Sequence, residues 1–217
     1  ASDELAQKIL DYKAMTGRPV YVYGNNMMAS GGYWVACAGD WLVANKYCTT
    51  GSIGVTYGAM LDFSGFLERY GIKVNTITSG DEKSMGSMLE EMAPETRAIF
   101  QSIINEYYGY FLDWVGSRRG MEKAVLQPLA DGRIYTATQA LGNGLIDQVG
   151  GYEDALSALD SRLGGHYPVA DYVPDKERSL FDRLQWLEYF LHYQGNDSQT
   201  LLRLLPPTGP LAYYQGQ

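Results

Sequence analysis

The spacing of apolar residues along the chain predicts an alternation of helices and strands. Apolar positions recur at helical spacing from Ser2 until Gly17, and the short apolar run at 20–23 is typical of a buried strand. A loop of small residues then leads into an apolar helix over 33–38. Strand, loop and helix in this order predict the α/β class.

The same alternation continues to about residue 163. Pro94 lies near the start of the longest predicted helix, whose apolar stripe extends to Gly120 and is typical of core or subunit packing. The other predicted helices cover 63–70, 122–129, 138–141 and 152–163. The other predicted strands cover 41–44, 53–61, 74–78 and 145–149.

The pattern changes after Gly164. Prolines interrupt it, an amphipathic helix is predicted over 180–191, and residues 204–217 show no periodicity. We therefore expect a compact core over 1–162 and a C-terminal appendage over 163–217, made of a helix and an extended tail. Because this tail is apolar and contains proline, like a peptide substrate, we expect it to occupy a groove of its own or of a neighbouring copy.

Composition narrows the classes of function. With 17 basic and 25 acidic side chains among 217 residues, the net charge is −8, so a nucleic-acid partner is not expected. No apolar stretch approaches the roughly 20 residues of a membrane span, and the N-terminus lacks a signal-peptide pattern, so we expect this chain to be soluble. Cys37 and Cys48 have no histidine at zinc spacing. We expect two buried thiols rather than a disulfide, and no metal or cofactor.

A serine followed by two glycines marks the first candidate for chemistry. Ser30 precedes Gly31 at a predicted strand-to-helix turn, which would expose the serine hydroxyl at the end of the strand. The glycines allow a substrate backbone to approach, and the Gly31 amide points to where an oxyanion would form. Met28 stands where a hydrolase elbow has glycine, and the same three residues are typical of a plain turn. The turn alone therefore leaves both interpretations open.

A nucleophilic serine needs a base, and histidine is poorly supplied. His166 lies beyond the core and His192 in the predicted tail helix, so a lysine, Lys83, becomes the candidate base. A free lysine is protonated at neutral pH, and lowering its pKa by roughly 3 costs about 4 kcal/mol, which requires a desolvated pocket. Carboxylates oppose this, so we expect Asp81 and Glu82 to face away from the site.

Five short motifs follow one another in an informative order. They are residues 27–36 around Ser30, 50–55, 78–83 ending in Lys83, 130–135, and 144–147. Together they resemble the signal peptide peptidase A family, also called protease IV, in its short, single-repeat bacterial form. The resemblance covers about residues 1–162.

The resemblance implies a serine endopeptidase with a Ser/Lys dyad. Ser30 would be the nucleophile and Lys83 the general base, while Ser52 would orient the lysine amine and the Gly31 amide would donate to the oxyanion. Released signal peptides or other membrane-associated peptides would be the substrates.

The same resemblance implies the architecture and the setting. The fold would be the ClpP/crotonase-like α/β arrangement of stacked βαβ units, without a cofactor, assembling into ring-like homo-oligomers in which neighbouring subunits share each dyad. The setting would be a bacterial cell membrane, with the catalytic domain extracytoplasmic. We expect Met27, Met28 and Tyr33 to line an apolar substrate groove, and we interpret the motif at 131–133 as a structural turn or ion pair.

The chain departs from the family pattern at its start. Family members carry a strand and a glycine-rich loop before the first helix, whose glycine supplies a second oxyanion hydrogen bond, and an N-terminal membrane anchor. Here the helix begins at Ser2, so we expect a fragment or a processed chain. Two other functions stay open: a catalytically silent peptide-binding or scaffold protein on the same fold, and a crotonase-type acyl-CoA enzyme. The set Ser30, Ser52 and Lys83 argues against the latter.

Overall fold

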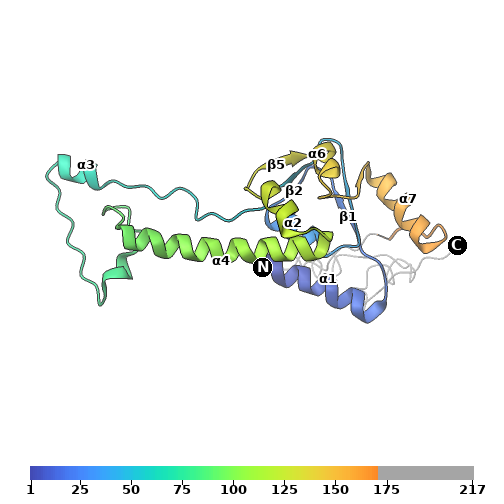
Figure 1. The fold of residues 1–217 in the computed structure, drawn as a ribbon, viewed down its shortest axis with the longest axis horizontal. Helices are drawn as coiled ribbons and strands as arrows, with labels where there is room; N and C mark the ends of the chain where they lie inside the picture. Colours follow the sequence, from blue (N-terminus) through green and yellow to red (C-terminus); the bar gives the residue numbers. More distant parts are fainter. Residues whose placement is uncertain (171–217) are drawn as a thin grey trace, which may run out of the picture. The chain divides into compact units, whose positions relative to one another are not determined.

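The computed structural model describes residues 1–170, apart from the surroundings of the Asp81 side chain (Figure 1). The chain divides into two compact units, Ala1–Gly165 and His166–Gln217, and all elements below belong to the first. The helix predicted over 180–191 and the tail over 204–217 lie outside the described residues.

Two three-stranded sheets form the centre of the first unit. One has the order β1-β3-β6, all parallel, with β1 at Tyr21–Gly24, β3 at Trp41–Ala44 and β6 at Gln148–Val149. The other has the order β2-β4-β5, with β2 at Met27–Ala29, β4 at Thr49–Gly51 and β5 at Ile134–Thr136. In it β2 and β4 are parallel, while β5 is antiparallel to β4. Successive turns of chain thus add one strand to each sheet, which confirms the predicted α/β class with stacked units.

Helices connect and cover these strands. They are α1 (Ser2–Thr16), α2 (Gly31–Ala36), α3 (Ser64–Arg69), α4 (Pro94–Arg119), α5 (Lys123–Leu126), α6 (Ala137–Gly142) and α7 (Tyr152–Leu163), with short 3-10 turns η1 (Asp81–Ser84) and η2 (Gln127–Leu129). Their ends follow the local sequence. Proline begins α4, and Gly17 and Gly120 end α1 and α4 in the left-handed conformation, as predicted.

The core gathers around α2 and β3. Tyr33 is buried and its hydroxyl donates to the carbonyl of Leu145 at 2.6 Å, which ties α2 to the segment before β6. The C-terminal half of α4 packs against the same core through the buried Leu112 and Val115. Cys37 and Cys48 are buried free thiols, as expected. No helix among the described residues is long and apolar enough to cross a membrane.

Residues 54–93, which we call the arm, leave this core with little burial (Figure 1). The arm holds α3 and η1 and leads into α4, whose N-terminal half projects with it. The strands predicted over 53–61 and 74–78 are absent from it, so these two predictions were wrong. The β-branched and aromatic residues there favour strands, but no strand in the described part of the chain pairs with them.

Candidate active site

Ser30 occupies a strained turn between β2 and α2. Its φ is 53° and its ψ −125°, a conformation that costs a non-glycine residue on the order of 1–3 kcal/mol. Hydrogen bonds hold the turn on both sides: the Ser30 N–H donates to the Gly51 carbonyl at 2.8 Å, and the Trp34 N–H donates to the Ser30 carbonyl at 2.9 Å. Ser30 itself is exposed. A strained, exposed serine between strand and helix is the geometry of a hydrolase nucleophile.

Ser52 occupies the equivalent place after β4, with a φ of 51°. Because Ala29 and Gly51 are opposite each other in the parallel pair of β2 and β4, the two serines follow paired residues at the same edge of the sheet. Among the described residues, Ser30 and Ser52 are the only non-glycine residues with a positive φ. The structure therefore brings these two predicted site residues together.

Tight packing behind the serines keeps this edge in place. The buried Thr50 hydroxyl donates to the Met28 carbonyl at 2.6 Å and so links β4 to β2 just before both turns. Gly51 has a φ of 82°, and a Cβ at that position would lie 2.7 Å from the ring of Tyr135. Only glycine fits there without displacing β5.

A turn formed by residues 131–133 lies against Ser52. The Ser52 N–H donates to the carbonyl of Arg133 at 2.8 Å. Within the turn, Arg133 Nε donates to the two carboxylate oxygens of Asp131 at 2.7 and 2.9 Å. Hydrogen bonds from Arg133 lower the pKa of the Asp131 carboxyl to about 2. The interpretation of this motif as a structural turn or ion pair agrees with the Asp131–Arg133 contact.

Gly31, the expected oxyanion donor, begins α2, and no backbone carbonyl of the described residues accepts its N–H. A Cβ on Gly31 would lie 2.6 Å from Ser2 Oγ, so glycine lets α1 approach the site. Met28 and Tyr33 belong to the core, which corrects the expectation that they line a groove. Both pack behind the turn that carries Ser30. Met27, which is 75% exposed, faces outward because side chains alternate along β2.

Lys83 is not at this site within one chain. It is exposed on η1, which is attached to the start of α4 because the Thr96 hydroxyl donates to the Glu82 carboxylate at 2.7 Å. The Glu82 carboxylate thus faces α4.

The other end of α4 lies against α2. The Trp114 indole N–H donates to the Trp34 carbonyl at 2.8 Å, and the two rings stack with centroids 5.3 Å apart. At the helical rise per residue, Thr96 and Trp114 are about 27 Å apart along the axis. One chain therefore holds the serine turn and the lysine turn near opposite ends of one straight helix (Figure 1).

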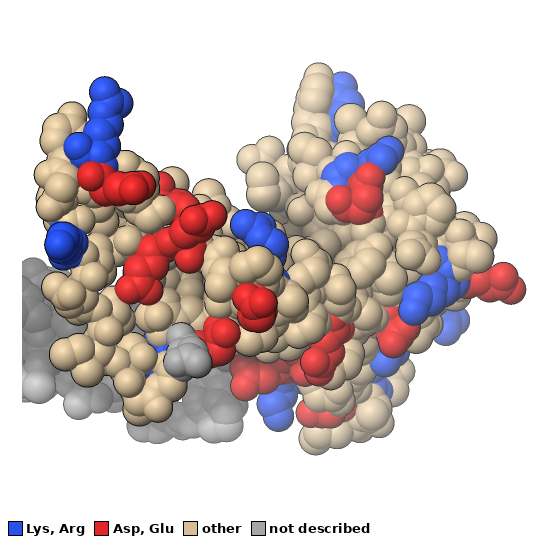
Figure 2. All heavy atoms as spheres, turned by 60° about the vertical axis from the view of Figure 1, so that its left-hand side comes forward, with Lys and Arg blue, Asp and Glu red and all other residues tan. Residues whose placement is uncertain are grey.

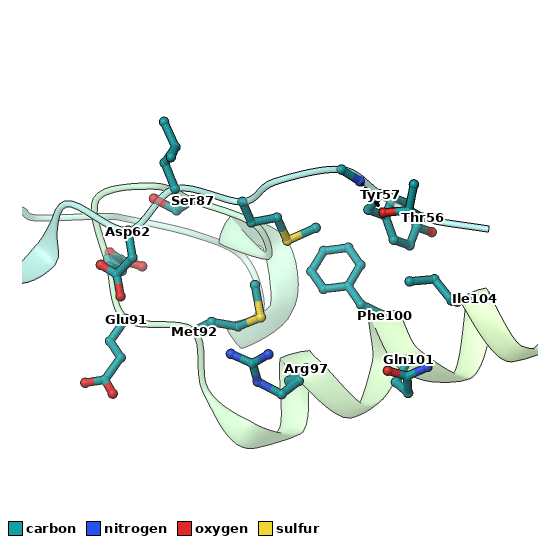
Figure 3. A pocket seen from close by; sticks show the side chains of 14 residues that line it. Thr56, Tyr57, Asp62, Ser87, Glu91, Met92, Arg97, Phe100, Gln101 and Ile104 are labelled. Carbon is teal, nitrogen blue, oxygen red and sulfur yellow. Dashed lines mark hydrogen bonds between the residues drawn. The ribbon is translucent and has the colours of Figure 1, made fainter. Parts of the chain in front are cut away.

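A hollow of about 400 Å³ lies away from the serines, between the arm and the projecting half of α4 (Figure 3). Phe100 and Ile104 give it an apolar wall on α4, and the rings of Tyr57 and Phe100 meet edge to face at 5.1 Å. The acidic side chains of Asp62 and Glu91 lie at its other end. This composition suits binding rather than covalent chemistry. Among the described residues, no group of three or more acidic, histidine or cysteine side chains could hold a metal ion.

The stacked β–α units and the strained serine at a strand-to-helix turn define an α/β protein of the hydrolase type. Comparison with known families is more specific. The model of peptidase family S49 matches residues 13–164, and the chain belongs to that family. The family match confirms the predicted resemblance to signal peptide peptidase A, and the parallel units described above confirm the predicted α/β class.

Three curated relatives illustrate the similarity. A putative protease of Methanocaldococcus jannaschii is 36% identical over 194 residues, which cover 89% of this chain and 60% of the relative. A putative signal peptide peptidase of Enterococcus faecium is 38% identical, with 73% of this chain and 45% of the relative covered. Protease 4 of Haemophilus influenzae is 30% identical, with 71% and 25% covered. The chain thus spans only part of the length of these relatives.

Solved structures with a similar fold are more distant. The 1510-N membrane-bound stomatin-specific protease has 14% identity and a TM-score of 0.41, with 70% of this chain and 60% of that chain covered. An enoyl-CoA hydratase/carnithine racemase from Magnetospirillum magneticum has 14% identity and a TM-score of 0.39, with 91% and 54% covered.

Proposed function

We propose that residues 1–162 form the core of a serine endopeptidase in which Ser30 is the nucleophile and Lys83 of a neighbouring copy is the general base. The observation that carries this proposal is the strained Ser30 turn beside an equally strained Ser52, in a chain of peptidase family S49. The names of the relatives, a signal peptide peptidase and protease 4, support peptides as the substrates.

In the proposed reaction the neutral Lys83 amine accepts the proton of Ser30 Oγ, and the oxygen attacks the carbonyl carbon of the scissile peptide. The Gly31 N–H donates to the resulting oxyanion. When the C–N bond breaks, the Lys83 ammonium gives its proton to the leaving amine, and the acyl group stays on Ser30 as an ester. Water, deprotonated by Lys83, then attacks the ester carbonyl, and as the C–O bond to Ser30 breaks the Lys83 ammonium returns the proton to Ser30 Oγ. Ser52 orients the amine throughout.

The shape of the chain favours a base from another copy. Direct proton transfer needs the two groups within about 3 Å. Thr96, which binds the lysine turn, and Trp114, which binds the helix after Ser30, are about 27 Å apart along α4. The arm that carries Lys83 also exposes large apolar side chains: Tyr57, Leu61, Phe66, Tyr70, Ile72 and Ile77. Figure 2, in which this side comes forward, shows broad uncharged areas between the charged side chains. Such a surface suits packing against a neighbour, and a repeated head-to-tail contact forms a ring when the rotation between copies closes.

Mixing two inactive variants tests the proposal. In the full-length protein, Ser30→Ala and Lys83→Ala should each lower the rate of peptide cleavage by at least about 10³-fold while the fold persists. When the two variants are unfolded together and reassembled, random assembly should restore about a quarter of the wild-type sites, because each such site draws its serine and lysine from different copies. The matched control mixes Ser30→Ala with the double variant, and should stay inactive.

Each alternative has its own outcome. Two inactive variants whose mixture also stays inactive would place the dyad within one chain. Undiminished cleavage by either single variant would overturn the Ser/Lys mechanism. A wild-type assembly that cleaves no peptide and whose Ser30 resists a serine-reactive probe would favour the silent scaffold, and tight binding of a CoA thioester would favour the acyl-CoA enzyme. We further propose released signal peptides as substrates and a bacterial cell membrane as the setting, in keeping with the Enterococcus faecium relative.

A further inference from the structure

The strained conformation of Ser52 depends on a partner outside its own strand pair. The last residues paired in β4 and β5 are Gly51 and Ile134. Beyond them, the Ser52 N–H still donates to the Arg133 carbonyl at 2.8 Å, and the Gly132 N–H donates to the Ile53 carbonyl at 3.0 Å. The turn of residues 131–133 therefore holds the backbone on both sides of the Ser52 side chain.

The two backbones approach so closely that the turn has little room to shift. A Cβ on Gly54 would lie 3.0 Å from the Cα of Gly132, and Gly132 has a φ of 90°. A contact that close is tighter than nine in ten real Cβ contacts, so a side chain at Gly54 would push against the turn, and the positive φ of Gly132 favours glycine there. A displacement of the turn is consequently transmitted to Ser52.

Side chains close this turn. The Arg133 guanidinium donates to the Asp131 carboxylate through Nε and Nη2. The Arg133 backbone N–H donates to the same carboxylate at 3.1 Å. Both side chains are about half exposed, and an exposed ion pair contributes little to global stability. Its setting is local, because Arg133, one member of the pair, also carries the carbonyl that accepts the Ser52 N–H.

We propose that Asp131 and Arg133 are positioning residues for Ser52, and through Ser52 for the lysine amine. The inference rests on the proposed function, in which the Ser52 hydroxyl orients that amine. If the turn opens, Ser52 is released from its strained φ and its Oγ moves away from the amine. A misplacement of about 1 Å can cost on the order of 10²-fold in rate.

Two substitutions separate the charge of the pair from its geometry. Asp131→Asn keeps an oxygen that can accept the backbone N–H but removes the charge that grips the guanidinium. Arg133→Lys keeps the positive charge but removes the planar guanidinium, which donates to the carboxylate through two nitrogen atoms. Each should lower kcat about tenfold to a hundredfold with KM near the wild-type value. The rise of kcat/KM with pH should also move to higher pH, because a Ser52 hydroxyl that donates to the amine favours its neutral form.

The most decisive measurement is whether the loss of kcat in Asp131→Asn depends on Ser52. In a Ser52→Ala background, Asp131→Asn should cost nothing further, since the group that it positions is gone. Asp11→Asn serves as the matched control, because Asp11 also pairs on the surface, with Lys8 at 3.6 Å, but on α1 away from the serines. An equal loss from Asp131→Asn in both backgrounds, or wild-type kcat in the single variant, would overturn the inference.

Amide hydrogen exchange tests the turn without any enzymatic activity. Exchange of the Ser52 N–H should be at least about tenfold faster in Asp131→Asn than in the wild type or in Asp11→Asn. Unchanged exchange would refute the positioning role even if no peptidase activity were found. Faster exchange in a wild-type protein that cleaves no peptide would instead retain the structural part and reject the proposed function.

Discussion

The serine edge of the sheet and the lysine-bearing arm are built in opposite ways. Ser30 and Ser52 lie on turns that are held by backbone hydrogen bonds and backed by the buried Thr50. Lys83 lies in a segment whose apolar side chains are largely exposed, and Ile77 in particular is 97% exposed. The candidate nucleophile is therefore held in place by its own chain. The arm cannot bury its apolar surface alone, so its final geometry depends on what it packs against.

Helix α4 has one half that is packed in the core and one half that projects with the arm, so substitutions in the two halves test the comparison. Leu112 lies in its buried half, and Leu112→Ala should lower the free energy of unfolding by about 2–5 kcal/mol. Ile99, in the projecting half, is 36% exposed, and Ile99→Ala should cost less than about 1 kcal/mol in the isolated chain. Denaturant unfolding of the dissociated protein measures both. Equal costs would show that the projecting half is packed as firmly as the core.

Two glycines with nearly the same φ sharpen the comparison. Gly51 has a φ of 82° and Gly58, in the arm, a φ of 80°, but a Cβ would clash with Tyr135 at the first site and meet nothing within 4 Å at the second. Gly58→Ala should carry only the backbone strain, on the order of 1 kcal/mol. Gly51→Ala should cost about 1–3 kcal/mol more and disturb both serine turns. Thermal unfolding and peptide cleavage report the two effects, and equal losses would contradict the packing argument.

Thiol reactivity gives the smallest and most local test. Burial raises the pKa of the Cys37 thiol to about 12 and also raises that of Cys48. Because the raised pKa keeps the thiol protonated in the folded state, neither cysteine should be alkylated by iodoacetamide at pH 8 until the protein unfolds. The matched variant Ile77→Cys should take up one label at once. Rapid labelling of the native cysteines would mean that the core opens as readily as the arm.

The elements that could be predicted from the sequence are those with a clear period and marked ends. The helix of Tyr152–Leu163, the strand of Trp41–Ala44 and the start of α4 at proline all match the predictions. The strands β2, β4 and β5 were missed because three residues are too few to show an alternation. The opposite error in the arm arose because β-branched residues indicate strand propensity but not the presence of a partner.

The candidate site, too, could be predicted from the sequence only in part. Ser30, Ser52 and Lys83 could be named from motifs, but their mutual positions could not. Met28 and Tyr33 were assigned to a groove because they flank the serine in sequence, whereas alternation along β2 and the helical period of α2 turn both into the core. The turn of 131–133 gave a sequence signal, but its contact with Ser52 crosses from one strand to another.

Residue order and composition by themselves predicted the alternation of elements and supplied the serine before two glycines. They also supplied the scarcity of histidine that makes lysine the candidate base. Only the tertiary structure decided that Ser30 and Ser52 are neighbours and that Lys83 is remote from them. Parallel pairing of β2 and β4 brings two distant strand ends to one edge, while the stiffness of α4 holds the lysine turn far away. Both are long-range consequences of packing and hydrogen bonding, which short-range sequence patterns do not encode.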